Sequence, residues 1–336
     1  MTDAKELKIK QPPVLFQKTQ RVIKRAETKL KKKLIVYWTS FIGGVCDSDV
    51  VALHNLFTRI GKHEDIALFI KSRGGDINAA LRIVHIIRTY NKKVTALIPL
   101  ESASSATLIA LGAEEIQMGP LAYLTPIDSS LIHDLSPLDQ VVHRKVSVSQ
   151  DEIFRIANLW EEKAQESHVH PYQELFKYIH PLVIGSLDRS SSLSIKICRE
   201  ILSYHIEDEE ECRRISSLLN SEFPSHNYPI TQRQAKKIGI NAVVMDDKLN
   251  DLLLELNVLY SEMAQKAITD FDEFNYHDNQ ILNIHESDGT QIYYQNDKDW
   301  NYLKDERRWQ ALNDDSTWHI NEIKNEKTVS SILHIS

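Results

Sequence analysis

The chain has 336 residues and a mass of 38.7 kDa; 42% of its residues are hydrophobic and 26% are charged. With only 10 Gly and 10 Pro, this composition is typical of a globular protein and excludes a collagen-like or low-complexity chain. No apolar run approaches the ~20 residues that cross a bilayer, and the first residues lack the apolar segment of a secretory signal. We therefore expect a cytoplasmic protein that does not associate with membranes.

The charge is unevenly distributed along the chain. Residues 1–33 carry eleven Lys and Arg against three acids, a net charge of +8, which leaves −15 for the remainder. A basic arm of this kind can contact nucleic acid or anionic lipid, or it can be a solvated helix. Because no aromatic platform or groove motif accompanies the arm, we interpret it as a solvated helix and expect no nucleic-acid partner.

The predicted elements of the first half alternate between strand and helix. In chain order they are a basic amphipathic helix over 14–33, strands over 34–38, 66–70 and 94–98, helices over 47–61 and 77–90 and another ending near 112, and short strands over 115–118 and 122–124. Strand–helix–strand repeats predict βαβ crossovers and a mainly parallel sheet. Since the strands are continuously apolar, both faces of the sheet are expected to be covered.

The second half has fewer strand signals. Residues 150–220 are predicted to be mostly helical, with 190–194, a serine-rich stretch, as a cap or loop before a helix at Ile195. Residues 231–264 are predicted to form a helix, a short strand over 242–244 and a final helix. From about 268 the chain becomes polar, acidic and aromatic, and we expect a separate C-terminal appendage.

Three of the five tryptophans, Trp300, Trp309 and Trp318, lie in this last segment. They are expected to be the core of a small hairpin module, or else a face that binds a partner.

Two turns follow predicted parallel strands, at the end of the sheet where such folds place their chemistry. Gly74 and Gly75 offer backbone N–H groups that a substrate carbonyl can approach, which suits an oxyanion; an ordinary turn is the alternative. Ser104 precedes a helix and has small neighbours, so its hydroxyl can meet a substrate next to the N–H of Ser105. Ser104 can equally be a helix N-cap, and the spacing alone favours that role.

A series of ordered motifs resembles the serine dehydrogenase proteinase family, a Clp-type, crotonase-like group of serine proteases with signal peptide peptidase A as a distant cousin. The motifs are SRGGD at 72–76, VTALIP at 94–99, SASSATLIALGAEEI at 102–116, LTPID at 124–128 and SHNYPIT at 225–231. The resemblance extends from about residue 21 to residue 260.

The resemblance implies a fold and an assembly. The fold is the α/β, Clp/crotonase-like ββα superhelical fold, with a mainly parallel sheet, a helical second half and a small C-terminal appendage. The expected domains are a basic arm over 1–33, a Clp/crotonase-like serine protease domain over 34–264 and an acidic extension over 265–336. The family also implies a homo-oligomer that acts on peptides or unfolded proteins without a cofactor.

The resemblance further implies a serine endopeptidase with residues in named roles. Ser104 matches the nucleophile, His226 the general base and Asp128 the aspartate that orients it; Gly74 and Gly75 match the oxyanion strip, which the N–H of Ser105 would complete. Some cousins use a serine–lysine dyad, and Lys145, which lies 41 residues after Ser104, is the alternative base.

Several positions depart from the family pattern. Ala106 and Thr125 stand where glycine is usual, Ser129 where proline is common and Asn227 where the family has aspartate, and the membrane segment of archaeal relatives has no counterpart. Added Cβ atoms at 106 and 125 could narrow the site. These changes motivate a second hypothesis, an inactive scaffold that binds a peptide or protein. A third hypothesis is an acyl-CoA enzyme on the same fold.

Cysteine and histidine spacing gives no sign of a metal. Cys46, Cys198 and Cys212 match neither a zinc pattern nor an even disulfide set, so we expect reduced thiols. The histidines at 168, 170, 180 and 205 lie near one another in the sequence, but no carboxylate or cysteine completes a ligand set at a recognisable spacing. We expect neither a metal nor another cofactor.

Overall fold

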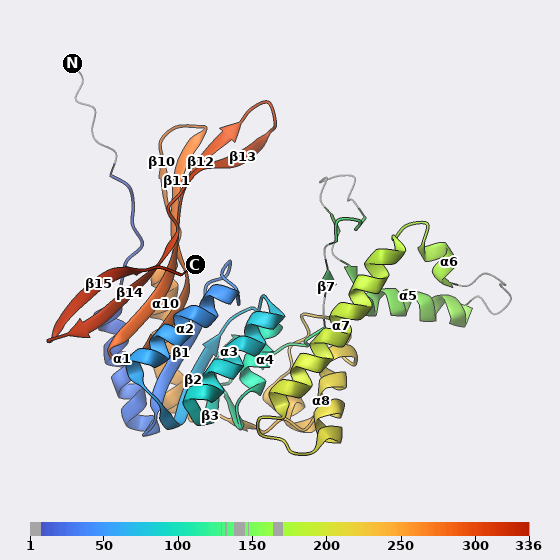
Figure 1. Ribbon diagram of the computed structural model, residues 1–336, viewed down its shortest axis with the longest axis horizontal. Coiled ribbons are helices and arrows are strands. Elements are labelled where there is room, and N and C mark those ends of the chain that lie inside the picture. The colour runs from blue at the N-terminus through green and yellow to red at the C-terminus, as the bar shows by residue number, and fades with distance from the viewer. Residues whose placement is uncertain are drawn as a thin grey trace.

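The computed structural model describes residues 8–128, 130, 131, 133–137, 145, 146, 148–163 and 171–335. Figure 1 shows a central sheet with helices on both faces, a helical lobe on one side and a β-arm that projects from the other. No helix in these ranges is long and apolar enough to cross a membrane.

The first half follows the predicted order closely. Its elements are α1 (Phe16–Leu30), β1 (Lys33–Thr39), α2 (Asp47–Ile60), β2 (His63–Lys71), α3 (Ile77–Tyr90), β3 (Asn91–Ile98), β4 (Glu101–Ser102), α4 (Ser105–Leu111), β5 (Glu115–Met118) and β6 (Tyr123–Leu124). Strands β1, β2, β3 and β5 pair in parallel, and the βαβ prediction is confirmed.

The second half is mainly helical, as expected. Its elements are β7 (Ser130–Leu131), β8 (Val148–Ser149), α5 (Gln150–Lys163), α6 (Pro171–Leu175), α7 (Pro181–Leu202), α8 (Glu209–Ser221), α9 (Gln232–Lys237), β9 (Ala242–Val244) and α10 (Asp247–Met263). Strand β9 adds in parallel to β5 at the far edge of the sheet.

The serine-rich stretch 190–194 lies inside α7, so the prediction of a cap or loop there was wrong. Serine is a poor helix former because its hydroxyl competes for backbone groups. In α7 these hydroxyls have tertiary partners instead: Ser194 Oγ donates to the Ile127 carbonyl at 2.5 Å, and Ser191 Oγ accepts from Asn220 Nδ2 at 2.8 Å. The serines therefore join α7 to its neighbours without interrupting it.

The central strands bury both of their faces. In β1, Ile35 and Tyr37 belong to the core beneath α2 and α3, whereas Val36 and Trp38 belong to the core beneath α1 and α10. Alternate residues of a strand point to opposite faces, so a strand covered on both sides must be apolar throughout. This explains the continuous apolar runs of the sequence and confirms the α/β class.

The C-terminal extension continues the central sheet. Its strands are β10 (Ala267–Asp270), β11 (Asn275–Ser287), β12 (Thr290–Leu303), β13 (Arg308–Asp314), β14 (Thr317–Lys324) and β15 (Lys327–Leu333). Strand β11 pairs antiparallel with β1, opposite the edge that β2 occupies. The extension is therefore continuous with the main sheet and not a separate module. It covers the edge of β1, which would otherwise be unpaired.

Buried polar groups fasten the extension to the body. The Glu286 carboxylate is fully buried and accepts hydrogen bonds from Thr19 Oγ1 at 2.5 Å and Tyr260 OH at 2.9 Å, as well as from two glutamine side chains. The Asp49 carboxylate, also fully buried, accepts from Asn283 Nδ2 at 2.8 Å and bonds His285 Nε2 at 2.9 Å. Each buried carboxyl group thus has several hydrogen-bond partners, as burial of such a polar group requires.

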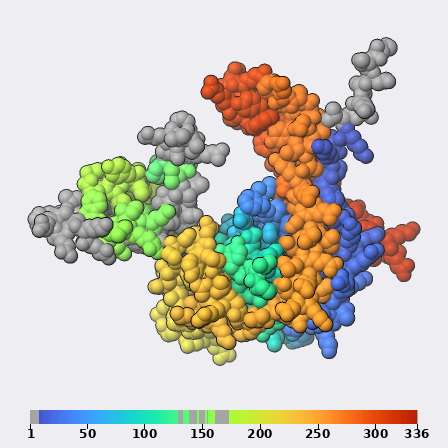
Figure 2. Space-filling model, turned by 180° about the vertical axis from the view of Figure 1, so that it is seen from behind, coloured from blue at the N-terminus to red at the C-terminus, as the bar shows by residue number. Residues whose placement is uncertain are grey.

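The tryptophans of the extension fall into two groups. Trp318 is 5% exposed and stacks on His285 in the main core. Trp300 and Trp309 contact Tyr276 in the projecting arm of β10 to β13, orange to red in Figure 2. The expectation that the three rings form the core of one hairpin module was wrong, because Trp309 is 41% exposed and Trp318 packs into the body.

Candidate active site

The glycine turn after β2 comes very close to Ser104. Gly74 and Gly75 have φ angles of +97° and +153°, a region that favours glycine. A Cβ atom on Gly74 would lie 2.7 Å from the Ala103 carbonyl oxygen and 2.8 Å from Ser104 Cβ. Only glycine fits here, and its backbone therefore lines the approach to Ser104.

Ser104 has a strained backbone and an uncommitted hydroxyl. It stands immediately before α4 with φ 52° and ψ −123°, and its side chain makes no capping hydrogen bond. Such a conformation in a residue other than glycine costs about 1–3 kcal/mol and tends to occur at functional sites. The structure does not support a role for Ser104 as an N-cap alone, because the hydroxyl does not perform that role.

Two backbone donors lie beside this serine. Within the described residues, neither the Gly75 N–H nor the Ser105 N–H has a hydrogen-bond acceptor. Val45 forms hydrogen bonds with both neighbours of Gly75. Its N–H donates to the Gly74 carbonyl at 3.0 Å, and its carbonyl accepts from the Asp76 N–H at 2.8 Å. Because successive peptide groups of a strand alternate in direction, the Gly75 N–H faces away from Val45.

Thr125 supports the serine turn. Its Oγ1 accepts a hydrogen bond from the Ser104 N–H at 2.8 Å, and Thr107 Oγ1 donates to the Thr125 carbonyl at 3.0 Å. Thr125 and Ala106 are both buried, and neither belongs to the described residues that line the cavity in front of Ser104. The narrowing expected from their Cβ atoms is therefore not seen.

His226 and Asp128 come together although 98 residues separate them in the chain. His226 Nδ1 lies 2.9 Å from Asp128 Oδ1. The hydrogen bond to Asp128 raises the pKa of His226 above its ordinary value, and partial burial opposes this shift. Leu124 and Ile230 exchange two backbone hydrogen bonds and thereby join the segments that carry the pair.

All the sequence-predicted site residues except Lys145 share one cavity of about 500 Å³. It is lined by Arg73, Gly74, Gly75, Asp76, Ile77, Ser104, Ser105, Leu108, Ile127, Asp128, Ser190 and His226. Among the described contacts there is no hydrogen bond between Ser104 and His226. Catalytic hydrogen bonds are often long in unliganded enzymes and tighten when substrate binds.

Six lining residues had no predicted role in the site, and Ser190 and Asp76 are two of them. Ser190 reaches the cavity from α7, which the sequence suggested was broken there. Asp76 lies at its rim and caps α3, because its side chain accepts from the Ala79 N–H at 2.8 Å. A capping signal, Asp before a long apolar helix, was available for Asp76; Ser190 had no comparable signal.

Lys145 does not share the cavity of Ser104. Its side chain is exposed, and its Nζ lies 2.6 Å from Asp134 Oδ1. It is not among the described residues that line the cavity. A lysine that activates a serine has to be desolvated beside it, and the exposed Lys145 side chain is not in such a position in the described structure.

The histidines considered as metal ligands have other partners where the structure describes them. His180 caps α7 by accepting from the Leu182 N–H, and His205 Nε2 lies 2.8 Å from the Leu111 carbonyl. His168 and His170 lie outside the described residues. Within the described part of the chain, no group of three or more His, Cys, Asp or Glu side chains is placed to hold a metal ion.

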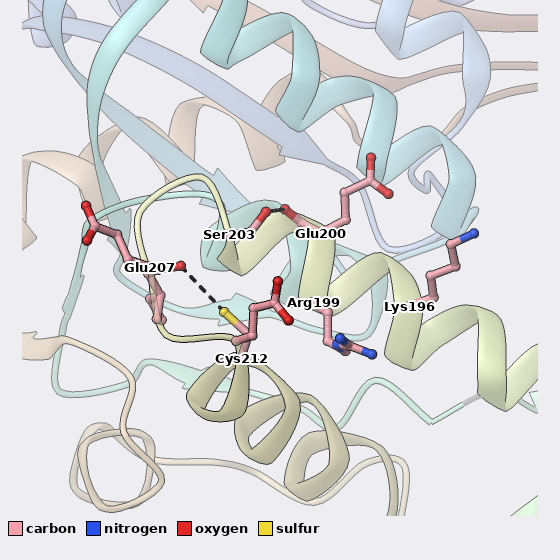
Figure 3. A pocket seen from close by; sticks show the side chains of 8 residues that line it. Lys196, Arg199, Glu200, Ser203, Glu207 and Cys212 are labelled. Carbon is pink, nitrogen blue, oxygen red and sulfur yellow. Dashed lines mark hydrogen bonds between the residues drawn. The ribbon is translucent and has the colours of Figure 1, made fainter.

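A second cavity, of about 440 Å³, lies between the end of α7 and the start of α8 (Figure 3). Its labelled side chains are mostly charged, and the Cys212 thiol at its wall contacts the Ile206 carbonyl at 3.7 Å. Burial, followed by the charge of Asp208, raises the pKa of this thiol, so it is not an activated nucleophile. The chemistry of the protein is better sought at Ser104.

Curated relatives and solved structures resemble parts of the chain. Two uncharacterized proteins of Methanocaldococcus jannaschii are 23% identical over 214 residues and 25% identical over 179 residues. These matches cover 62% and 52% of this chain, and 64% and 51% of the relatives. The chain thus matches only about half to just under two thirds of their length.

Among solved structures, a variant of the 1510-N membrane-bound stomatin-specific protease in complex with a substrate peptide is 18% identical, with a TM-score of 0.37. The match covers 66% of this chain and 80% of that one. ClpP1 from Listeria monocytogenes is 16% identical, with a TM-score of 0.36 over 70% of this chain and 99% of that one.

A family model matches the segment of the chain that carries Ser104. The model of the ClpP-like SDH-type serine proteinases matches residues 42–177, which include the glycine turn, Ser104 and Asp128. His226 and the C-terminal extension lie outside the matched segment. Over residues 42–177 the chain is thus similar to the ClpP-like SDH-type serine proteinases, in agreement with the resemblance seen in its motifs.

Proposed function

We propose that the protein is a serine peptidase that cleaves peptide bonds through an acyl-enzyme on Ser104. The observation that carries this proposal is the Ser104 turn. A strained serine with an uncommitted hydroxyl faces the same cavity as two unpaired backbone donors and a His–Asp pair. A turn with a structural role alone does not require this combination.

The residues divide the reaction between them. Ser104 Oγ adds to the substrate carbonyl carbon while His226 Nε2 takes the hydroxyl proton. His226 Nδ1–H donates to Asp128, which fixes the tautomer and stabilises the imidazolium. The Gly75 and Ser105 N–H groups hold the oxyanion. The C–N bond then breaks, His226 returns the proton to the leaving amine, and water hydrolyses the acyl ester by the same steps.

Peptides and unfolded segments are the proposed substrates, and a homo-oligomer is the proposed assembly. The glycine turn supports this proposal, because the Gly75 N–H lines the cavity without an acceptor among the described residues and an extended peptide can pair with such a group. Sedimentation analysis of the purified chain tests the assembly state, and a monomer at micromolar concentration would contradict it.

Covalent labelling with a fluorophosphonate probe, followed by peptide mapping, tests the catalytic proposal. We expect wild type to be labelled on Ser104 and the label to be lost in Ser104→Ala and His226→Ala. Ser203→Ala is the matched control, because Ser203 is an exposed helix-end serine that bonds its own helix at Glu200; it should label as wild type does.

The other outcomes separate the alternatives. An unlabelled, folded wild type would favour the inactive scaffold. Labelling that persists in His226→Ala and fails in Lys145→Ala would keep the hydrolase and replace its base. A label on a serine other than Ser104 would overturn the assignment of the nucleophile.

A further inference from the structure

Strand β11 of the C-terminal extension holds the loop that precedes α2. The pairing of β11 with its neighbour β12 shifts between Ile281 and Asn283. At this irregularity the Leu282 carbonyl accepts a hydrogen bond from the Ser40 N–H at 2.7 Å. A Cβ atom on Gly43 would lie 2.5 Å from the same carbonyl. The loop over 40–46 is therefore pressed against β11 with no room for a side chain at Gly43.

Asn283 makes the side-chain contact at this junction. Its side chain is buried, with 4% of the residue exposed, and its Nδ2 donates to the Gly44 carbonyl at 2.9 Å and to Asp49 Oδ1 at 2.8 Å. One amide thus joins the end of the loop to the first turn of α2. Without this donor, the partly buried Gly44 carbonyl and the buried Asp49 carboxylate would each lose a hydrogen bond.

The residue after Gly44 is Val45, which brackets the glycine turn. Val45 accepts from the Asp76 N–H and donates to the Gly74 carbonyl, and this pairing turns the Gly75 N–H toward the other side. A Cβ atom on Gly75 would lie 2.4 Å from the Val45 carbonyl oxygen, so the two backbones are in direct contact. Any shift of Gly44 and Val45 is therefore passed on to Gly75.

We propose that Asn283 is a positioning residue for the oxyanion strip, acting through Gly44 and Val45 on the Gly75 N–H. This inference rests on the proposed function for its catalytic consequence and on the backbone contacts for its structural one. It makes the C-terminal extension, which lies outside the family-matched segment, part of the apparatus that stabilises the transition state.

Asn283→Ala and Asn279→Ala form a matched pair for the test. Both asparagines are buried in β11, but Asn279 bonds Gln11 and Asp297 on the arm side and does not reach the loop. Two quantities are measured in each variant: hydrogen exchange of the Val45 and Asp76 N–H groups, and the labelling of Ser104 by a fluorophosphonate over a range of probe concentrations.

For Asn283→Ala we expect hydrogen exchange at the Val45 and Asp76 N–H groups to accelerate about tenfold or more. The reason is that their hydrogen bonds to the Gly74 and Val45 carbonyls loosen. We expect the maximal labelling rate to fall about 10- to 100-fold with little change in the probe concentration at half-maximal rate, since a misplaced oxyanion donor weakens the transition state. Asn279→Ala should change neither quantity beyond about twofold, even if its melting temperature falls.

The outcomes distinguish this proposal from the proposed function. If wild type is not labelled, yet Asn283→Ala alone accelerates exchange at Val45 and Asp76, the peptidase proposal fails and the positioning contact stands. Unchanged exchange in Asn283→Ala, or equal effects in both variants, would overturn the positioning role. If Asn283→Ala does not fold, Gly43→Ala tests the same junction from the loop side, with the same expected and contrary results.

Discussion

Asp128 and His226 are each four residues from the backbone bridge that joins Leu124 to Ile230, in opposite directions along the chain. The bridge is a single antiparallel pair, and His226 lies in a turn beyond it. The bridge joins the two segments of the chain, and the 2.9 Å hydrogen bond between Asp128 and His226 connects residues that are 98 positions apart.

Replacing the carboxylate should change both the rate and its pH dependence. The hydrogen bond to Asp128 raises the pKa of His226, and a base acts only when neutral, so labelling of wild type should rise with pH through a value above about 6.5. In Asp128→Asn the midpoint should move to lower pH, and the plateau should fall on the order of 10²–10⁴-fold. The labelling rate is measured between pH 5 and 9.

An unchanged midpoint in Asp128→Asn would show that another group controls the profile. Asp134→Asn serves as the control, because Asp134 pairs with Lys145 and does not contact His226. Its profile should match that of wild type.

A methyl group at Gly74 should abolish labelling of Ser104. The added Cβ atom would lie 2.7 Å from the Ala103 carbonyl and 2.8 Å from Ser104 Cβ, at a φ of +97°. Gly61→Ala is the control for backbone strain, because Gly61 has a φ of +80° with open space around it. We expect Gly61→Ala to lose about 1 kcal/mol of stability and to label normally; normal labelling of Gly74→Ala would refute the close approach.

Thr125→Ala should weaken the Ser104 turn, and Thr125→Ser should preserve it. The serine hydroxyl can still accept from the Ser104 N–H, whereas alanine removes the acceptor of this partly buried donor at a cost of about 0.5–1.5 kcal/mol. We expect a labelling rate about tenfold lower in Thr125→Ala and within about threefold of wild type in Thr125→Ser. Equal rates in the two variants would mean that the hydroxyl has no part in holding the turn.

Buried Glu286 should make the fold less stable as the pH rises from 4.5 to 7. Burial raises its pKa to about 7, in spite of its four hydrogen-bond donors. Below about pH 4.5 the folded and unfolded states are both protonated at this group. Between 4.5 and 7 only the unfolded state loses the proton, so up to about 3 kcal/mol of stability disappears with rising pH.

Chemical unfolding at pH 5 and pH 8 measures this effect. Glu286→Gln should lower the free energy of unfolding at pH 5, because its NH2 group would face the side-chain donors that now bond to Glu286. The difference in the free energy of unfolding between pH 5 and pH 8 should be smaller than in wild type. A wild type as stable at pH 8 as at pH 5 would show that Glu286 is ionised in the fold throughout.

The order of elements and most of the site could be predicted from local pattern. Continuous apolar runs marked the parallel strands, and the small-residue turns at their ends marked Gly74 and Ser104. The family resemblance then added Asp128 and His226, whose pairing depends on the Leu124–Ile230 bridge, which no local pattern reveals.

The place of the C-terminal extension could not be predicted in this way. Asn283, His285 and Glu286 are polar, and a strand that carries them suggests a solvated surface. They are buried because their partners, Asp49 and Thr19, lie more than 200 residues earlier in the chain. Satisfied polar groups in a core leave no hydrophobic periodicity to detect.

The pairing of β11 with β1 also bears on solubility. Without it, β1 would present a row of unpaired N–H and C=O groups beside the large rings of Tyr37 and Trp38, the kind of strand edge that recruits other chains. A chain shortened to end after α10 would keep β1 and expose that edge. The extension thus protects β1 from pairing with other chains. We expect a chain shortened in this way to aggregate before its peptidase activity could be assayed.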